Sequence, residues 1–191
     1  MCLTSDRDYA TFDSSLKTAI NGTYTSVSKD YPRILSIGPS FFESYQTWPD
    51  VQFIHGFNLA KNDSAAFVSI RDSISYACDA LSKNNLLGWE MGNEPDLYKT
   101  SAQGIVRPAS WSEADYVKEW TARVAVVKDE LKQKCGEEWV SNQKFKWIAP
   151  SFAGTKNSLD AVKAWNAGLD ASNRNIAQFS SHKQVPIPDV R

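Results

Sequence analysis

The chain has 191 residues, enough for one domain with a sizeable hydrophobic core. Its formal net charge is −1 and it contains no basic run, so the sequence gives no support to nucleic-acid binding. No stretch is long and apolar enough to suggest a membrane span, and the first residues lack the pattern of a signal peptide. Aromatic residues reach 12%, which fits either a well-filled core or surfaces that stack against sugar rings.

The three cysteines, Cys2, Cys78 and Cys135, lack the close spacing that metal sites use, so we expect no metal site. Their odd number leaves at least one thiol unpaired, and the sequence alone does not choose a pairing. Cys78 falls on the apolar side of a predicted helix, where we expect it to be a small buried residue.

In the first third of the chain, the expected elements are a helix, a strand, a short helix and a second strand. The first helix covers residues 9–20 and ends at an Asn-Gly pair. An apolar run over 33–37 stops at Gly38-Pro39, which predicts a strand that leads into a loop. A short helix over 41–47 and a buried strand over 51–59 follow.

The middle of the chain alternates between helix and strand. Apolar residues spaced by three and four predict an amphipathic helix over 64–82. A short apolar strand follows over 86–92, and a long polar loop comes after it. The pattern S-x-x-E from Ser110 to Glu113 predicts a capping box, and the helix that it opens is expected to run to about Gln133.

The last third continues the alternation, with a strand over 145–149 closed by Pro150, a helix over 159–165 and a strand over 176–181. This order predicts an α/β fold with a parallel sheet covered by helices, either a doubly wound sheet or a (β/α)8 barrel. No Gly-rich phosphate loop follows any strand, which disfavours the nucleotide-binding folds. Four or five strands cannot close a barrel of eight, so a barrel would be partial.

The motif that carries chemistry is Gly-Asn-Glu-Pro, residues 92–95, where an apolar strand ends. In barrels, catalytic groups lie at the carboxyl ends of the strands, which is where Asn93 and Glu94 are expected. Pro95 has no backbone N–H and is expected to hold Glu94 at extended backbone angles. A carboxyl group held at a strand end can donate a proton to a glycosidic oxygen. The alternative is a glutamate that only caps a loop or a helix.

Together with this motif, four further segments resemble glycoside hydrolase family 79, the fungal-type β-glucuronidases. They are GPSFFESYQTWP (38–49), FIHGFNLA (53–60), WIAPS (147–151) and SSH (180–182). The resemblance implies a partial (β/α)8 TIM barrel with about strands three to six and their helices. Residues 1–191 would then form an incomplete catalytic barrel domain, without the C-terminal β-sandwich domain usual in the family.

The resemblance also implies catalytic and sugar-binding roles for Asn93 and Glu94 of the Gly-Asn-Glu-Pro motif. Asn-Glu-Pro at the end of the fourth strand marks the acid/base of the retaining (β/α)8 glycosidases. Glu94 would protonate the leaving group and then take a proton from the incoming water. Asn93 would bind the 2-hydroxyl of the sugar, a bond that strengthens as the ring becomes an oxocarbenium ion.

Two further residues are expected to line the sugar pocket, Asn58 at the end of the third strand and His182 at the end of the sixth. For Asn58 the alternative is a turn-forming asparagine. For His182 the alternative carries more weight, because the sequence after it departs from the family. His55 lies mid-strand and is expected to pack, and Glu90, whose strand parity matches Glu94, is not expected to be catalytic.

Retention requires a second carboxylate, the nucleophile, which the family places after strand seven. Since this sequence stops matching the family after strand six, we expect the chain to be incomplete at both ends and to lack the nucleophile. The alternative function is a catalytically inactive, truncated gene product with at most weak sugar binding. Another glycosidase of the superfamily is disfavoured by the segment FFESYQTW.

The expected substrate is a glycan that carries terminal β-linked glucuronic acid, an assignment that rests on the resemblance. Two carboxylates and water suffice for the reaction, so no cofactor is implied. The resemblance also implies a secreted protein. Two glycosylation sequons, at Asn21 and Asn62, are weakly consistent with secretion.

Overall fold

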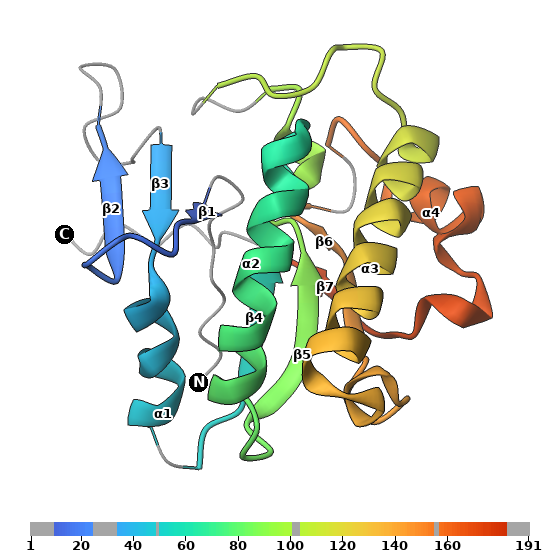
Figure 1. Cartoon of the computed structure of the whole chain (residues 1–191). Coiled ribbons are helices and arrows are strands. Elements are labelled where there is room, and N and C mark those ends of the chain that lie inside the picture. The colour runs from blue at the N-terminus through green and yellow to red at the C-terminus, as the bar shows by residue number, and fades with distance from the viewer. Residues whose placement is uncertain (1–9, 25–33, 49, 101–103, 155–156, 183–191) are drawn as a thin grey trace, which may run out of the picture.

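The fold is known from a computed structural model, which describes residues 10–24, 34–48, 50–100, 104–154 and 157–182. Two separate sheets are present (Figure 1). The smaller has the order β1-β3-β2, with β1 at Ala10–Phe12, β2 at Ile20–Thr23 and β3 at Ile34–Ile37. The larger has the order β4-β5-β6-β7, with β4 at Phe53–Phe57, β5 at Leu86–Met91, β6 at Trp147–Phe152 and β7 at Ile176–Ser181.

The larger sheet is parallel throughout, and its strands follow one another in chain order. Helix α2 (Ser64–Ala80) connects β4 to β5, and helix α3 (Glu113–Cys135) connects β5 to β6. Between β6 and β7 lie α4 (Ala161–Ala164) and a π-helical turn (Trp165–Leu169). These are four consecutive strands with their crossover helices, so the predicted α/β fold with a helix-covered parallel sheet is confirmed.

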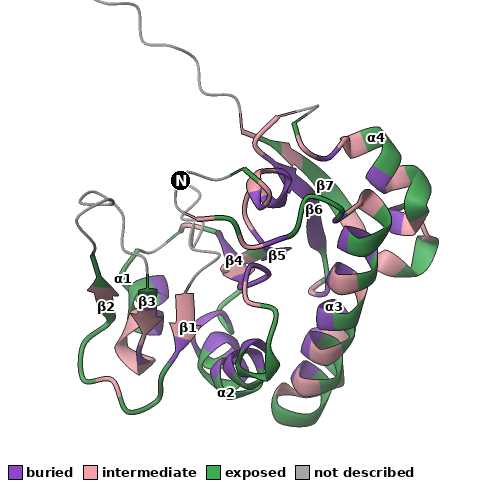
Figure 2. Ribbon diagram, turned by 90° about the horizontal axis from the view of Figure 1, so that it is seen from above, coloured by how far each residue is buried: buried purple, intermediate pink, exposed green. Residues whose placement is uncertain are grey.

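Alternation along the strands decides what each face of this sheet contains. Phe57, Trp89 and Trp147 join the hydrophobic core that α2 and α3 complete, and all three are buried. Glu90 and Ile148 alternate with them and pair on the other face. Figure 2 shows the buried residues running along the strands β5 and β6 and along one side of each long helix. Most aromatic residues that the structure describes are therefore core residues rather than exposed stacking surfaces.

Both long helices begin at a residue whose side chain binds a free backbone N–H. The carboxylate of Asp63 accepts the N–H of Ala66 at 3.3 Å. Helix α3 opens with a capping box formed by Ser112 and Asp115, so the predicted box from Ser110 to Glu113 is wrong. The Glu113 carboxylate instead accepts the N–H of Asp160, at 3.1 Å, and joins α3 to the start of α4.

The helix predicted over residues 9–20 is wrong. Tyr9 lies outside the described residues, and residues 10–20 form β1, a turn and the start of β2. Strand β3 pairs with both β1 and β2 in the smaller sheet. Short polar side chains explain the difference, because they bind local backbone groups and compete with a helix. The Asp13 carboxylate accepts both the N–H and the hydroxyl of Ser15, and the Thr18 hydroxyl donates to the carbonyl of Ile20.

The strand predicted to close at Pro150 continues to Phe152. Pro150 falls between Ile148 and Ser151, where the pairing of β6 with β7 shifts register. A proline at such an irregularity removes no regular ladder bond, so the strand passes through it. As a result the backbone of Ser151 reaches the carboxyl edge of the sheet.

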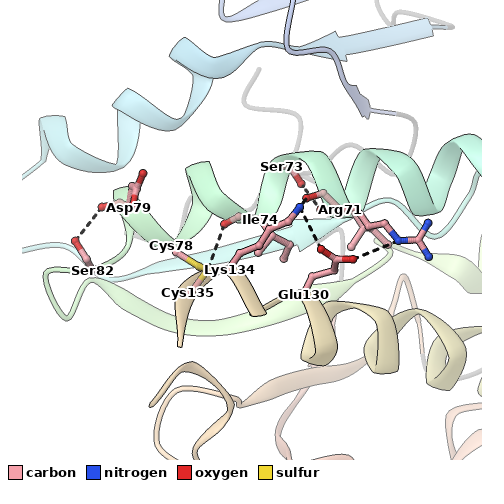
Figure 3. The surroundings of a disulfide bond; sticks show 10 residues. Arg71, Ser73, Ile74, Cys78, Asp79, Ser82, Glu130, Lys134 and Cys135 are labelled. Carbon is pink, nitrogen blue, oxygen red and sulfur yellow. Dashed lines mark hydrogen bonds and ion pairs between the residues drawn. A yellow bond between two sulfur atoms is a disulfide. The ribbon is translucent and has the colours of Figure 1, made fainter. Parts of the chain in front are cut away.

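Helices α2 and α3 are joined by a disulfide between Cys78 and Cys135 (Figure 3). Cys78 is buried as predicted, but it is not a simple packing residue, because its partner comes from 57 positions along the chain. Beside the bond, Glu130 lies 3.3 Å from Arg71 and 3.1 Å from Lys134. The bond and these contacts hold the two crossover helices side by side.

Removal of this disulfide is expected to destabilise the chain. A loop of this length gives a chain-entropy contribution of about 4 kcal/mol, and measured effects are typically ~2–4 kcal/mol. We expect Cys78→Ser and Cys135→Ser each to lower the free energy of unfolding by about that amount, measured by urea denaturation with tryptophan fluorescence. Val162→Ser, at an exposed position of α4, is the control and should leave the midpoint unchanged. An unchanged midpoint on addition of a reductant would contradict the expectation.

Candidate active site

The carboxyl ends of the four parallel strands lie at one edge of the sheet, the upper edge in Figure 1. At the end of β5, Gly92 has a positive φ of 78° and donates its N–H to the carbonyl of Phe57 at 2.9 Å. A Cβ atom on Gly92 would lie 2.6 Å from the Cβ of Leu59. Glycine is therefore required here both by the backbone angle and by the lack of space.

Glu94 follows in a left-handed conformation, with φ 51° and ψ 45°. The extended backbone predicted from Pro95 is therefore wrong. Two backbone bonds hold the observed geometry: Glu94 donates its N–H to Ser151 at 2.8 Å and accepts the N–H of Leu97 at 2.9 Å. The second bond belongs to the short 3-10 helix η2 (Pro95–Leu97). A left-handed non-glycine residue costs about 1–3 kcal/mol and persists only where its surroundings fix it.

The carboxyl group of Glu94 faces His182, with Oε1 3.2 Å from Nδ1. His182 comes directly after β7, and its N–H donates to the carbonyl of Phe152 at 2.9 Å. The side chains of Glu94 and His182 are 31% and 29% exposed, so a ligand at this edge can reach both. The structure thus brings together two residues that lie 88 positions apart in the sequence.

Asn58, at the end of β4, is buried, and both ends of its amide bind backbone groups. Its Nδ2 donates to the carbonyl of Ala10 at 2.8 Å, and its Oδ1 accepts the N–H of Lys61 at 2.9 Å. This is the pattern of a turn-forming asparagine, which ties β1 to the end of β4. Asn93 is half-buried between Gly92 and Glu94. The sugar-binding roles given to Asn58 and Asn93 stay predictions.

His55 of β4 and Glu90 of β5 are both buried. Burial lowers the pKa of His55 to about 3, and its Nδ1 lies 2.8 Å from the Tyr45 hydroxyl, so it is a neutral packing residue at neutral pH. The Ser151 hydroxyl donates to the Glu90 carboxylate. Glu90 therefore contacts the same β6 segment that binds the backbone of Glu94.

Sequence reasoning missed Asp96, whose fully buried carboxylate binds the loop after β6. It accepts the N–H of Ala153 at 2.8 Å and the side-chain amide of Asn157 at 2.6 Å. Burial raises the pKa of Asp96, and the hydrogen bonds that it accepts lower it in part. An acidic residue directly after the proline of a short turn was the available signal, but the partners of Asp96 lie 57 and 61 residues away.

Arg107 was missed as well. It is buried in the loop before α3 and donates to the carbonyls of Leu59 and Ala60 at 2.8 and 2.7 Å. Its ion pair with Glu119 of α3 measures 2.7 Å, and its guanidinium lies 5.4 Å from the ring centre of Trp111. These contacts satisfy the buried charge and connect the loops after β4 and β5 to α3.

Within the five described ranges, no group of three or more His, Cys, Asp or Glu residues could hold a metal ion. No helix among them has the length and hydropathy of a membrane span. Of the two sequons, Asn21 is exposed on β2 at the edge of the small sheet, and Asn62 is exposed just before α2.

No protein-family model matches the chain. It is 54% identical over 180 residues to a β-glucuronidase of Aspergillus niger and 43% identical over 182 residues to one of Neurospora crassa. Each match covers 94% of this chain and 32% of the relative, so the chain spans about a third of these proteins.

Among solved structures, the chain resembles the 4-O-α-L-rhamnosyl-β-D-glucuronidase of Fusarium oxysporum 12S in its Rha-GlcA complex. The TM-score is 0.58 at 25% identity, over 94% of this chain and 35% of the other. This match is consistent with the sheet being part of a (β/α)8 barrel. The resemblance to fungal β-glucuronidases is thus confirmed, and the chain corresponds over nearly its whole length to about a third of such a protein.

Proposed function

We propose that the protein acts as a glycoside hydrolase of β-glucuronidase type, which removes terminal β-linked glucuronic acid from glycans with retention of configuration. The observation that carries the proposal is the position of Glu94, at the carboxyl end of β5 and in contact with His182 from the end of β7. The names of the relatives support the reaction class. The sugar in the complex of the Fusarium structure supports a substrate that contains glucuronic acid.

In the first step, the protonated Glu94 carboxyl gives its proton to the glycosidic oxygen as the bond from that oxygen to the anomeric carbon breaks. A second carboxylate attacks the anomeric carbon from the opposite face and forms a covalent glycosyl–enzyme. In retaining enzymes this group lies about 5–5.5 Å from the acid. By family resemblance, we place it after a seventh strand, outside the four parallel strands described.

In the second step, the ionised Glu94 takes a proton from a water molecule whose oxygen attacks the anomeric carbon and releases the second carboxylate. An imidazole N–H at His182 would donate to the Glu94 carboxylate in this step and orient it for the incoming water. Asn93 would bind the sugar 2-hydroxyl, and Asn58 would line the pocket from β4.

We further propose that the protein is secreted and glycosylated. The Cys78–Cys135 disulfide supports an oxidising compartment, since structural disulfides are rare in the cytosol. The exposed positions of Asn21 and Asn62 are accessible to a glycan.

The reaction class can be tested in a chimera in which this chain replaces the matching segment of the Aspergillus niger relative. We expect the chimera to hydrolyse aryl and alkyl β-glucuronides and to leave the matching β-glucosides intact. A folded chimera that cleaves β-glucosides in preference would assign the chain to another glycosidase class. A folded chimera without any turnover would favour the inactive alternative.

Glu94→Gln tests the acid/base in the same chimera. General acid assistance contributes about 10²–10⁴-fold, so we expect kcat/KM on an alkyl β-glucuronide to fall by a factor in that range. For a highly activated aryl β-glucuronide, the rate of the first step should fall less, because its leaving group needs little protonation. Glu137→Gln removes a carboxylate that is 71% exposed and serves as the matched control. If Glu94→Gln hydrolysed the alkyl substrate at the wild-type rate, the assignment of Glu94 as the acid/base would be wrong.

Expression of the chain in a secreting yeast host tests the sequons. We expect Asn62→Gln and Asn21→Gln each to remove one glycan, seen as a step in mass that endoglycosidase treatment abolishes. Asn142→Gln, at an exposed asparagine without a sequon, is the control. A secreted chain of unmodified mass would contradict the expectation.

A further inference from the structure

The loop after β5 is joined to the loop after β6 through one residue, Asp96. Its side chain is fully buried, and Oδ1 accepts the N–H of Ala153 at 2.8 Å. The other oxygen, Oδ2, accepts the N–H of Gly154 at 3.2 Å and the Nδ2 of Asn157 at 2.6 Å. The backbone carbonyl of Asp96 accepts both the N–H, at 3.3 Å, and the hydroxyl of Ser158. Four residues of the β6 loop therefore bind this one position.

The same part of the chain also holds Glu94. The N–H of Glu94 donates to the carbonyl of Ser151, two residues before Ala153. Glu94 is thus fixed on its amino side by Ser151, and on its carboxyl side by Asp96 two residues later. Its left-handed backbone, with φ 51°, requires such support from the surrounding structure.

We propose that Asp96 is a positioning residue, which sets the direction of the Glu94 carboxyl group for proton transfer. This inference rests on the proposed acid/base role of Glu94. A purely stabilising residue could lie anywhere in the core. Asp96 instead binds the loop that directly follows the end of β6, the strand to which the backbone of Glu94 is bonded.

The chemistry of the contacts defines the variant that tests this role. An ionised carboxylate only accepts hydrogen bonds, which matches the three N–H donors around Asp96. In Asp96→Asn the side chain keeps its shape, but an NH₂ group replaces one acceptor. That group would face another donor, and a buried donor without an acceptor costs ~1–3 kcal/mol. The loops should then separate slightly and release Glu94.

The kinetic test compares two leaving groups in the Aspergillus niger chimera. A misdirected acid slows hydrolysis only of substrates whose leaving group needs protonation. General instability lowers the rates for the alkyl and the aryl substrate by the same factor. We expect Asp96→Asn to lower kcat/KM for an alkyl β-glucuronide at least about tenfold more than for an activated aryl β-glucuronide, within the range of acid assistance. Cys78→Ser is the control that destabilises the fold elsewhere, and it should lower both rates equally. An equal loss for both substrates in Asp96→Asn would leave Asp96 a stabilising residue only.

A second measurement does not depend on activity. In the 191-residue chain, Asp96→Asn should speed amide hydrogen exchange at Glu94 and Ala153 by at least about tenfold relative to Trp89, whose amide binds Lys146 in the sheet. Should Asp96→Asn not fold, Asn157→Ala removes one donor and should shift exchange in the same direction. Unchanged exchange at Glu94 in the folded variant would overturn the proposal. Faster exchange at Glu94 in an inactive chimera would reject the proposed function and keep the structural link.

Discussion

The packing of aromatic side chains between the parallel sheet and its helices is the interaction on which the rest of the structure depends. Trp147 of β6 meets Trp120 of α3 edge to face, with ring centres 5.6 Å apart, and Phe57 stacks on Trp89 at the same distance. Because these rings fill the helix side of the sheet, the alternate residues and the strand ends are left for other roles. Because the four strands are parallel, their carboxyl ends lie at a single edge, where Glu94 meets His182.

Buried polar contacts join the loops at that edge to one another and to α3. Arg107 and Glu119 join the loops after β4 and β5 to α3, and Asp96 joins the loop after β5 to the one after β6. Buried charges of this kind are stable only when every partner is in place, and they tolerate little displacement. Such rigidity would suit the role proposed for Glu94, that of an acid which meets a glycosidic oxygen within hydrogen-bond distance.

Local sequence patterns were sufficient to predict the long helices and the parallel strands. The helices around Ile70 and Val127, the four parallel strands and the strand-end position of Glu94 all follow from periodicity and from one motif. The failures have physical causes: short polar residues near Asp13 form turns where a helix was expected, and the backbone of Glu94 is fixed by Ser151 rather than by Pro95. The two cysteines of the disulfide are 57 residues apart, and the groups that bind the Asp96 carboxylate are just as distant. The Leu59 and Ala60 carbonyls that bind Arg107 also lie more than 40 residues away, so no local pattern could reveal these contacts.

Two residues of the Gly-Asn-Glu-Pro motif (92–95) are constrained for different reasons, as the lack of space at Gly92 makes clear. A side chain at Gly92 would collide with Leu59, so a substitution there reduces the amount of folded protein. A substitution at Glu94 changes a side chain that is partly exposed. In a mutational scan that scores only turnover, substitutions at Gly92 and Glu94 would look equally harmful. A scan that also scores cellular abundance would separate them, because only substitutions at Gly92 would lower the amount of protein. The first residue of the motif is thus constrained by backbone geometry, and the third by the reaction proposed for it.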